Sequence, residues 1–240
     1  MGEFLTGSCG RGRVYEAFLL LPAIQKHIEN TLLKKLKYET DKTIYALGCG
    51  DTTMYSPNNK MVYVDSNKAA LGETEKNLKE SGRDLSTSVF LNNPAVDVIP
   101  KYDGIALLCW SLHHMISKDD KTIDNALLEK HINYLSENYS RILIGEAGLD
   151  LPDLFGGAHL HLPHDTLKNR FEAIGFDVVC EEILISKDRE AIVNNIPLKP
   201  WFNGKTDATE RFLMDVFLEM NEDKGINDKA AYILDIKKLK

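Results

Sequence analysis

Short apolar segments alternate with helix-like segments along residues 43–185, and this alternation restricts the fold more than any other feature of the sequence. Strand-like runs are short and rich in Val, Ile, Leu and Tyr, and most of them end at Gly, Asn or an acid. Strands joined by helices form parallel sheets that are covered on both faces. The sequence therefore predicts a doubly wound α/β fold. The predicted strands are residues 43–47, 61–65, 88–91, 104–110, 141–145, 176–185 and 231–236.

Helical periodicity is expected for residues 15–38, 68–81, 123–135, 164–173 and 208–220. Pro22 lies inside the first of these and is expected to divide it. No repeat and no Gly/Ser linker separates two parts of the chain, so we expect one domain. Its predicted parts are an N-terminal helical cover (1–42), a core (43–185), an insertion or lid (186–228) and a last strand in residues 229–240.

The net charge of −7 is unevenly distributed along the chain. Residues 43–185 hold 12 basic and 21 acidic side chains, whereas residues 186–240 hold 10 of each. No segment presents a dense cationic face, so we expect no nucleic-acid partner. The four cysteines contain no Cys-x-x-Cys pair, which favours reduced thiols. The most apolar stretch, residues 17–24, is too short to span a bilayer, and the first residues lack the pattern of a secretion signal. We therefore expect a cytoplasmic protein with no membrane partner.

Candidate functional residues stand at the predicted strand ends, because parallel sheets bind ligands at the carboxyl ends of their strands. Gly48-Cys49-Gly50 follows the first strand and Asp65 ends the second. Glycines allow a ligand to approach the backbone, and a carboxylate can accept from two ribose hydroxyls, so this layout suits a nucleoside. A dinucleotide also needs a helix N-terminus and a third glycine. The third glycine is absent, residues 51–60 leave little room for a helix, and Asp51 would repel phosphate.

The sequence resembles the class I S-adenosylmethionine-dependent methyltransferases. The resemblance rests on Ala46-Leu47-Gly48-Cys49-Gly50-Asp51, on Val64-Asp65, on Asn92-Asn93, on the segment from Tyr102 through Trp110 to His114, and on Phe171-Glu172-Ala173-Ile174-Gly175-Phe176. It implies a Rossmann-like, mostly parallel seven-stranded sheet whose last strand is antiparallel, with helices on both faces. It also implies S-adenosyl-L-methionine as cofactor and methyl transfer to an N, O or C atom.

The same resemblance implies which residues hold the cofactor. Asp65 would bind the ribose and Asn92 or Asn93 the adenine. Ala46 stands where the family usually has an acid, and Thr52 where it usually has a glycine. Asp51, Arg11, Arg13 or Tyr15 could hold the methionine end in place of the missing acid. The full set of expected cofactor-binding residues is Gly48, Cys49, Gly50, Asp51, Asp65, Ser66, Asn92, Asn93, Trp110 and Tyr15.

Five of the seven histidines fall into two clusters, His113-His114 and His159, His161 and His164. Imidazoles are common metal ligands, but Asp, Glu or Cys partners at defined spacing are not evident, and we expect no metal. His113 or His114 could act as a general base, and His159 or His161 could face the methyl acceptor. Alternatively, these histidines cap helices or line a polar surface.

Other residues complete the candidate site. Glu146 follows a predicted strand and is either a partner for a substrate amine or hydroxyl or a solvated loop acid. Trp110 either packs in the core or lines the cofactor pocket. Trp201 in the predicted lid is a candidate substrate contact, and a neutral, apolar-rich cover suits a small-molecule acceptor. Two alternatives remain open, an NAD(P)-dependent oxidoreductase and a non-catalytic methyltransferase-like binding protein, while the oligomeric state is not predicted.

Overall fold

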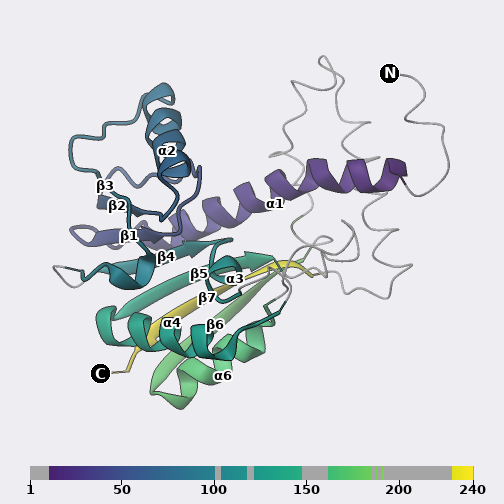
Figure 1. The fold of residues 1–240 in the computed structure, drawn as a ribbon, viewed down its shortest axis with the longest axis vertical. Coiled ribbons are helices and arrows are strands. Elements are labelled where there is room, and N and C mark those ends of the chain that lie inside the picture. Colours follow the sequence, from purple (N-terminus) through teal and green to yellow (C-terminus); the bar gives the residue numbers. More distant parts are fainter. Residues whose placement is uncertain are drawn as a thin grey trace.

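A computed structural model describes residues 11–100, 104–117, 122–147, 162–184, 188, 191 and 229–239, with residues 11–22, 147, 229 and 230 described by their backbone alone. Seven strands form one sheet of order β3-β2-β1-β4-β5-β7-β6 (Figure 1). Strand β7 is antiparallel to both of its neighbours, and the other strands run parallel to one another. This topology confirms the predicted mostly parallel sheet with an antiparallel last strand. The strands are β1 (Thr43–Leu47), β2 (Lys60–Val64), β3 (Val89–Leu91), β4 (Ile105–Cys109), β5 (Arg141–Ala147), β6 (Phe176–Leu184) and β7 (Lys229–Lys238).

Helices cover both faces of the sheet (Figure 1). One face packs against α1 (Arg11–Leu36) and α2 (Lys68–Glu80), and the other packs against α3 (Leu112–Met115), α4 (Asn125–Asn138) and α6 (His164–Ala173). Alternate residues of each strand point to opposite faces, so Leu143 joins the core on the α1 side while Ile144 joins the core on the α4 side. Two-sided burial explains why the strands read as nearly continuous apolar runs.

Helix α1 lies directly on the middle of the sheet. The part of its apolar stripe that is described, from Ala23 to Leu36 and including Ile28 and Leu32, is fully buried. A Cβ atom placed on Gly145 of β5 would lie 2.3 Å from Cγ2 of Ile28 and 3.1 Å from Cδ1 of Leu32. A residue without a side chain is therefore what allows α1 to pack this closely against β5.

The structure corrects the predicted division of the first helix. Helix α1 begins at Arg11 and continues through Pro22 to Leu36. A proline removes one backbone hydrogen bond from a helix, but the buried stripe that follows Pro22 holds the rest of this helix on the sheet. Two short helices were not predicted, α3 and the 3-10 turn η1 (Ala95–Asp97). The predicted helix at residues 208–220 lies outside the described residues.

The connection between β1 and β2, residues 48–59, contains no helix. Met54 in this connection is 1% exposed and packs in the core on the α1 side, where its carbonyl accepts a hydrogen bond from the Tyr63 hydroxyl (2.8 Å). Helix α1, which precedes the sheet in the sequence, covers the same face. The short connection is thus accommodated by a buried methionine and by a helix from another part of the chain.

The close approach of α1 to Gly145 yields a first prediction. Gly145→Ala should lower the free energy of unfolding by about 1–3 kcal/mol, because the new methyl group must displace Ile28 in a packed core. Urea unfolding followed by circular dichroism measures the change.

Gly72→Ala is the matched control, because a Cβ at Gly72, on the exposed side of α2, meets no atom within 4 Å. Alanine is the better helix former, so this control should raise the stability by about 0.5–1 kcal/mol. Equal stability of the two variants would contradict the packing described for α1.

Candidate functional site

The segment after β1, residues 48–53, is here called the glycine loop. Gly48 and Gly50 have φ angles of +63° and +56°, in the left-handed region that favours glycine. Asp65, directly after β2, accepts a hydrogen bond at Oδ2 from the Gly50 N–H (2.8 Å) and another at Oδ1 from the Asn67 N–H (2.7 Å). Each carboxylate oxygen has two lone pairs, so Asp65 is held in place while keeping capacity for further donors.

The residues that follow β3 are joined to the same region. Asn92 donates from Nδ2 to the carbonyls of Asp65 (2.9 Å) and Ser66 (3.0 Å), which leaves its Oδ1 as an exposed acceptor. Asn93 is exposed beside it. The structure thus brings the carboxyl ends of β1, β2 and β3 together, and hydrogen bonds join the predicted site positions Gly50, Asp65, Ser66 and Asn92 there.

The two glycines of the loop have different surroundings. A Cβ on Gly48 would lie 3.0 Å from Cβ of Ser111 and would collide with the side chain of Met115. A Cβ on Gly50 would meet no atom within 4 Å. Gly48 therefore packs against α3, whereas Gly50 borders open space beside Asp65. That open space is where the backbone could receive a ligand.

Glu146 near the end of β5 organises the start of α3. It is 2% exposed, and its Oε1 accepts from the N–H groups of Ser111 (3.2 Å) and Leu112 (2.8 Å). Its Oε2 lies 2.7 Å from Nδ1 of His113, which is 3% exposed. Where the Glu146 carboxylate is the acceptor of this contact, the Nδ1 atom of His113 is the donor. Glu146 and His113 form a buried pair, which residue spacing did not predict.

The Ser111 side chain connects this pair to the glycine loop. Its hydroxyl donates to the Leu47 carbonyl (3.0 Å) at the end of β1. Next to it, His114 is exposed and its ring lies 4.0 Å from that of His113, centroid to centroid. Trp110 has a φ of +52°, donates its N–H to the Gly145 carbonyl (2.7 Å) and packs partly buried on the core of the α1 side.

The described thiols near the site are held in their protonated form. Burial, and then the nearby charge of Asp65, raise the pKa of Cys49 to about 12. Burial, followed by the charges of Glu29 and Glu146, raises the pKa of Cys109 well above its usual value. A thiol must ionise to act as a nucleophile, so neither cysteine is suited to that role at neutral pH.

Glu29 of α1 is a buried carboxylate that the sequence analysis missed. It is 4% exposed, and its Oε1 accepts from the Thr52 hydroxyl (2.9 Å) while its Oε2 accepts from Nζ of Lys26 (2.8 Å). Glu29 directly follows Ile28 at the edge of the apolar stripe, and this position was the available sequence signal for its burial. Acids at such positions are usually solvated, so the signal is weak. The charge of Glu29 also contributes to the raised pKa of Cys109 at the end of β4.

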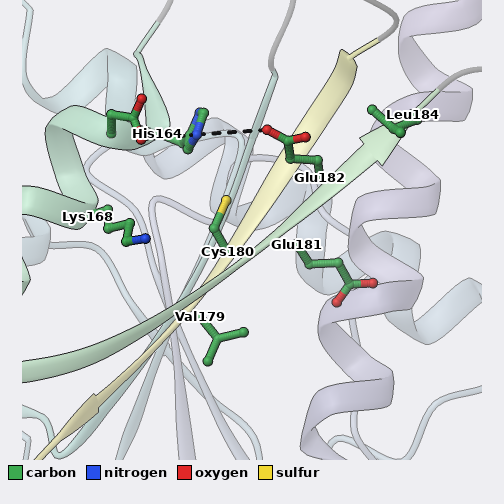
Figure 2. Close-up of a pocket in the computed structure, with 8 residues that line it drawn as sticks. His164, Lys168, Val179, Cys180, Glu181, Glu182 and Leu184 are labelled. Atoms are coloured by element: carbon green, nitrogen blue, oxygen red, sulfur yellow. Dashed lines mark ion pairs between the residues drawn. The ribbon is translucent and has the colours of Figure 1, made fainter.

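A separate cavity of about 590 Å³ lies between α6 and the edge strand β6 (Figure 2). His164 faces Glu182 across it, with 3.9 Å between Nε2 and Oε1, and Lys168 and Cys180 also line it. Glu181 extends from the same strand toward α1, where it pairs with Lys35. Because β7, β5 and β4 separate β6 from β1, this cavity is distinct from the glycine loop.

Several predicted site residues cannot be placed. Tyr15 belongs to α1 by its backbone, but its side chain lies outside the described residues, and so do His159, His161 and Trp201. Asp51 is exposed, and its carbonyl accepts from Nδ2 of Asn77 (3.3 Å). Among the residues described, no group of three or more His, Cys, Asp or Glu side chains is arranged to hold a metal ion. Likewise, no helix within the described ranges is long and apolar enough to cross a membrane.

Solved structures share this fold at low sequence identity. YjhP from E. coli is 14% identical, with a TM-score of 0.52, and the match covers 92% of this chain and 99% of that one. A SAM-dependent methyltransferase from Thiobacillus denitrificans, in complex with S-adenosyl-L-homocysteine, is 14% identical, with a TM-score of 0.53 and coverage of 88% and 91%. Magnesium protoporphyrin IX methyltransferase from Synechocystis, with bound SAM, is 10% identical, with a TM-score of 0.54 and coverage of 90% and 80%.

No protein-family model matches the sequence, and no curated protein matches it. The structural likenesses therefore establish the fold, which is the one predicted from the resemblance to class I methyltransferases.

The pairing of Glu146 with His113 yields a second prediction. In Glu146→Gln, the side-chain amide should donate to Nδ1 of His113, because the amide oxygen is retained by the N–H groups of Ser111 and Leu112. The proton of neutral His113 should then move from Nδ1 to Nε2. Nitrogen NMR shifts of the imidazole ring report this tautomer directly.

His131 is the internal control for that measurement. Its Nδ1 lies 2.8 Å from the Leu127 carbonyl, which only accepts, so its Nδ1 is protonated in both proteins. An unchanged His113 tautomer in Glu146→Gln would show that Glu146 does not set the protonation of that ring.

Proposed function

We propose that this protein binds S-adenosylmethionine at the glycine loop and transfers its methyl group to an N, O or C atom of a small molecule. The main observation behind this proposal is the position of the Asp65 carboxylate. The N–H groups of Gly50 and Asn67 hold it beside the open space at Gly50. A fixed carboxylate with spare lone pairs suits a pair of ribose hydroxyls. Structures with the same fold that hold SAM or S-adenosylhomocysteine support this choice of ligand.

The connection between β1 and β2 argues against a dinucleotide. A pyrophosphate is usually held by the N–H groups at a helix N-terminus, and residues 48–59 form no helix. Asp51 and Asp65 also place negative charge beside the loop. A nucleoside without phosphates avoids both difficulties, which favours S-adenosylmethionine over NAD(P).

The residues of the chain have separate roles in the proposed reaction. Asp65 binds the ribose, while the exposed Oδ1 of Asn92 or the side chain of Asn93 accepts from the adenine amino group, with Ser66 beside them. The cofactor, when bound, supplies a methyl group that is already activated on a sulfonium. The protein mainly needs to hold the acceptor atom and, for a hydroxyl or ammonium acceptor, to take up its proton.

We propose that His113 or His114 is the general base that takes up this proton. Glu146 keeps Nδ1 of His113 protonated, so the Nε2 atom of neutral His113 has the lone pair that a base requires. Glu146 is therefore better described as a positioning residue than as a contact of the substrate. A small-molecule acceptor agrees with the absence of a dense cationic segment in the sequence.

Cofactor binding is tested by calorimetric titration with S-adenosylhomocysteine. The wild-type protein should bind it with micromolar affinity, and Asp65→Ala should abolish binding because the ribose loses its acceptor. Asp177→Ala, an exposed acid on β6, is the matched control and should bind as the wild type does. Binding of NADH in place of S-adenosylhomocysteine would support an oxidoreductase, and binding of neither would support a non-catalytic protein.

The base is tested by turnover. S-adenosylhomocysteine release would be measured with a panel of small amines, phenols and carboxylates as acceptors. His113→Ala or His114→Ala should lower kcat by about 10²–10⁴-fold for an acceptor that must lose a proton, while the affinity for S-adenosylhomocysteine stays unchanged. Unchanged rates in both variants would remove the base from the mechanism.

A further inference from the structure

The glycine loop is held mainly by side chains, because no helix follows it. On the α2 side, Asp65 accepts from the Gly50 N–H and the Thr74 hydroxyl donates to the Gly50 carbonyl (2.5 Å). A helix would ordinarily fix the residues after such a loop through its own backbone hydrogen bonds. Here the loop needs anchors of another kind on its other side.

Helix α1 supplies those anchors. The Thr52 hydroxyl, in a residue that is 5% exposed, donates to Oε1 of Glu29 (2.9 Å) and accepts from the Met54 N–H (3.1 Å). The same hydroxyl thus ties α1 to the backbone that leaves the loop. A buried carboxylate requires such donors, because burial without them is strongly unfavourable.

Lys26, one helical turn before Glu29, completes the arrangement. Its Nζ donates to Oε2 of Glu29 (2.8 Å) and to Oγ1 of Thr53 (2.7 Å). Two residues of α1 therefore hold two consecutive residues of the loop, which come from a part of the chain more than twenty positions away. We call Lys26, Glu29, Thr52 and Thr53 the α1 latch.

We propose that Glu29 and Lys26 are positioning residues for the cofactor site, and that the α1 latch holds the glycine loop in its binding conformation. The inference rests on the proposed function and extends it to a helix outside the nucleoside-binding core. By linkage, a ligand that requires this loop conformation also strengthens the docking of α1. The affinity for the ligand therefore depends on hydrogen bonds that do not touch it.

Calorimetric titration with S-adenosylhomocysteine tests the latch through Thr52. Valine has nearly the same shape as threonine but no hydroxyl, so Thr52→Val removes the hydrogen bond to the Glu29 carboxylate. Part of the cost of that loss should reach the ligand site and weaken binding by about tenfold. Thr52→Ser keeps the hydroxyl and should bind within about twofold of the wild type.

Lys26→Met provides a second test, which remains available if Thr52→Val fails to fold, because Lys26 is 38% exposed. We expect an affinity about threefold to fivefold lower. Lys35→Met is its matched control. Lys35 also lies on α1 and also pairs with a carboxylate, Glu181 (2.7 Å), but Glu181 belongs to β6, which three strands separate from β1 and the glycine loop. It should bind as the wild type does.

Hydrogen exchange gives a readout that a merely structural role would not move. In the wild type, S-adenosylhomocysteine should slow exchange of amides in residues 23–36 as well as in the glycine loop, and Thr52→Val should lose the first effect at saturating ligand. If the wild type binds S-adenosylhomocysteine, and Thr52→Val and Lys26→Met bind it as tightly as the wild type does, the latch is overturned and the proposed function stands. If the wild type does not bind, the proposed function falls, and the latch with it.

Discussion

The absence of a helix between β1 and β2 is the constraint on which the rest of the structure depends. A crossover between two parallel strands usually provides both a cover for the sheet and a rigid base for the loop that precedes it. Residues 48–59 provide neither through backbone structure. Met54 and the early helix α1 cover the sheet instead, and the hydrogen bonds of Asp65, Thr74 and Glu29 shape the loop.

Two carboxylates at the carboxyl ends of strands are held by the same kind of hydrogen bond but have different roles. Asp65 and Glu146 each accept two backbone N–H groups, which fixes the orientation of each side chain. Asp65 remains half-buried, so its remaining lone pairs face a region that a ligand can reach. Glu146 is buried, and its second oxygen is directed to His113. Exposure therefore distinguishes the carboxylate that we propose binds a ligand from the one that orients another residue.

The sequence predicted the elements whose signal is local. Residues 43–47 and 164–173 have the predicted bounds in the structure, because apolar runs and a helix stop at Gly175 mark them clearly. The uninterrupted α1 and the short α3 were not predicted, since each depends on packing or on a distant partner. Helix α3 begins where Glu146, more than thirty positions later, accepts from its first N–H groups. Such a partner has no local trace in the sequence.

The same reasoning explains the incomplete prediction of the site. Gly50, Asp65 and Asn92 stand at the ends of strands, where topology alone brings them together. Glu29 belongs to a helix that precedes the sheet, and its place beside the loop follows from how closely α1 packs on Gly145. The close packing of Ile28 on Gly145 thus accompanies the contact that the next residue, Glu29, makes with the glycine loop.

The charges at the carboxyl ends of the strands also limit the class of ligand. Glu29 on one face and Glu146 on the other both act on Cys109 at the end of β4, with Lys26 as an opposing charge. Asp65 adds a further carboxylate at the end of β2. Interactions between charges are strong where water is excluded, so these carboxylates agree with the proposal of a ligand that carries positive charge and no phosphate. The proposed cofactor carries a sulfonium and an α-ammonium group, whereas NAD(P) carries a pyrophosphate.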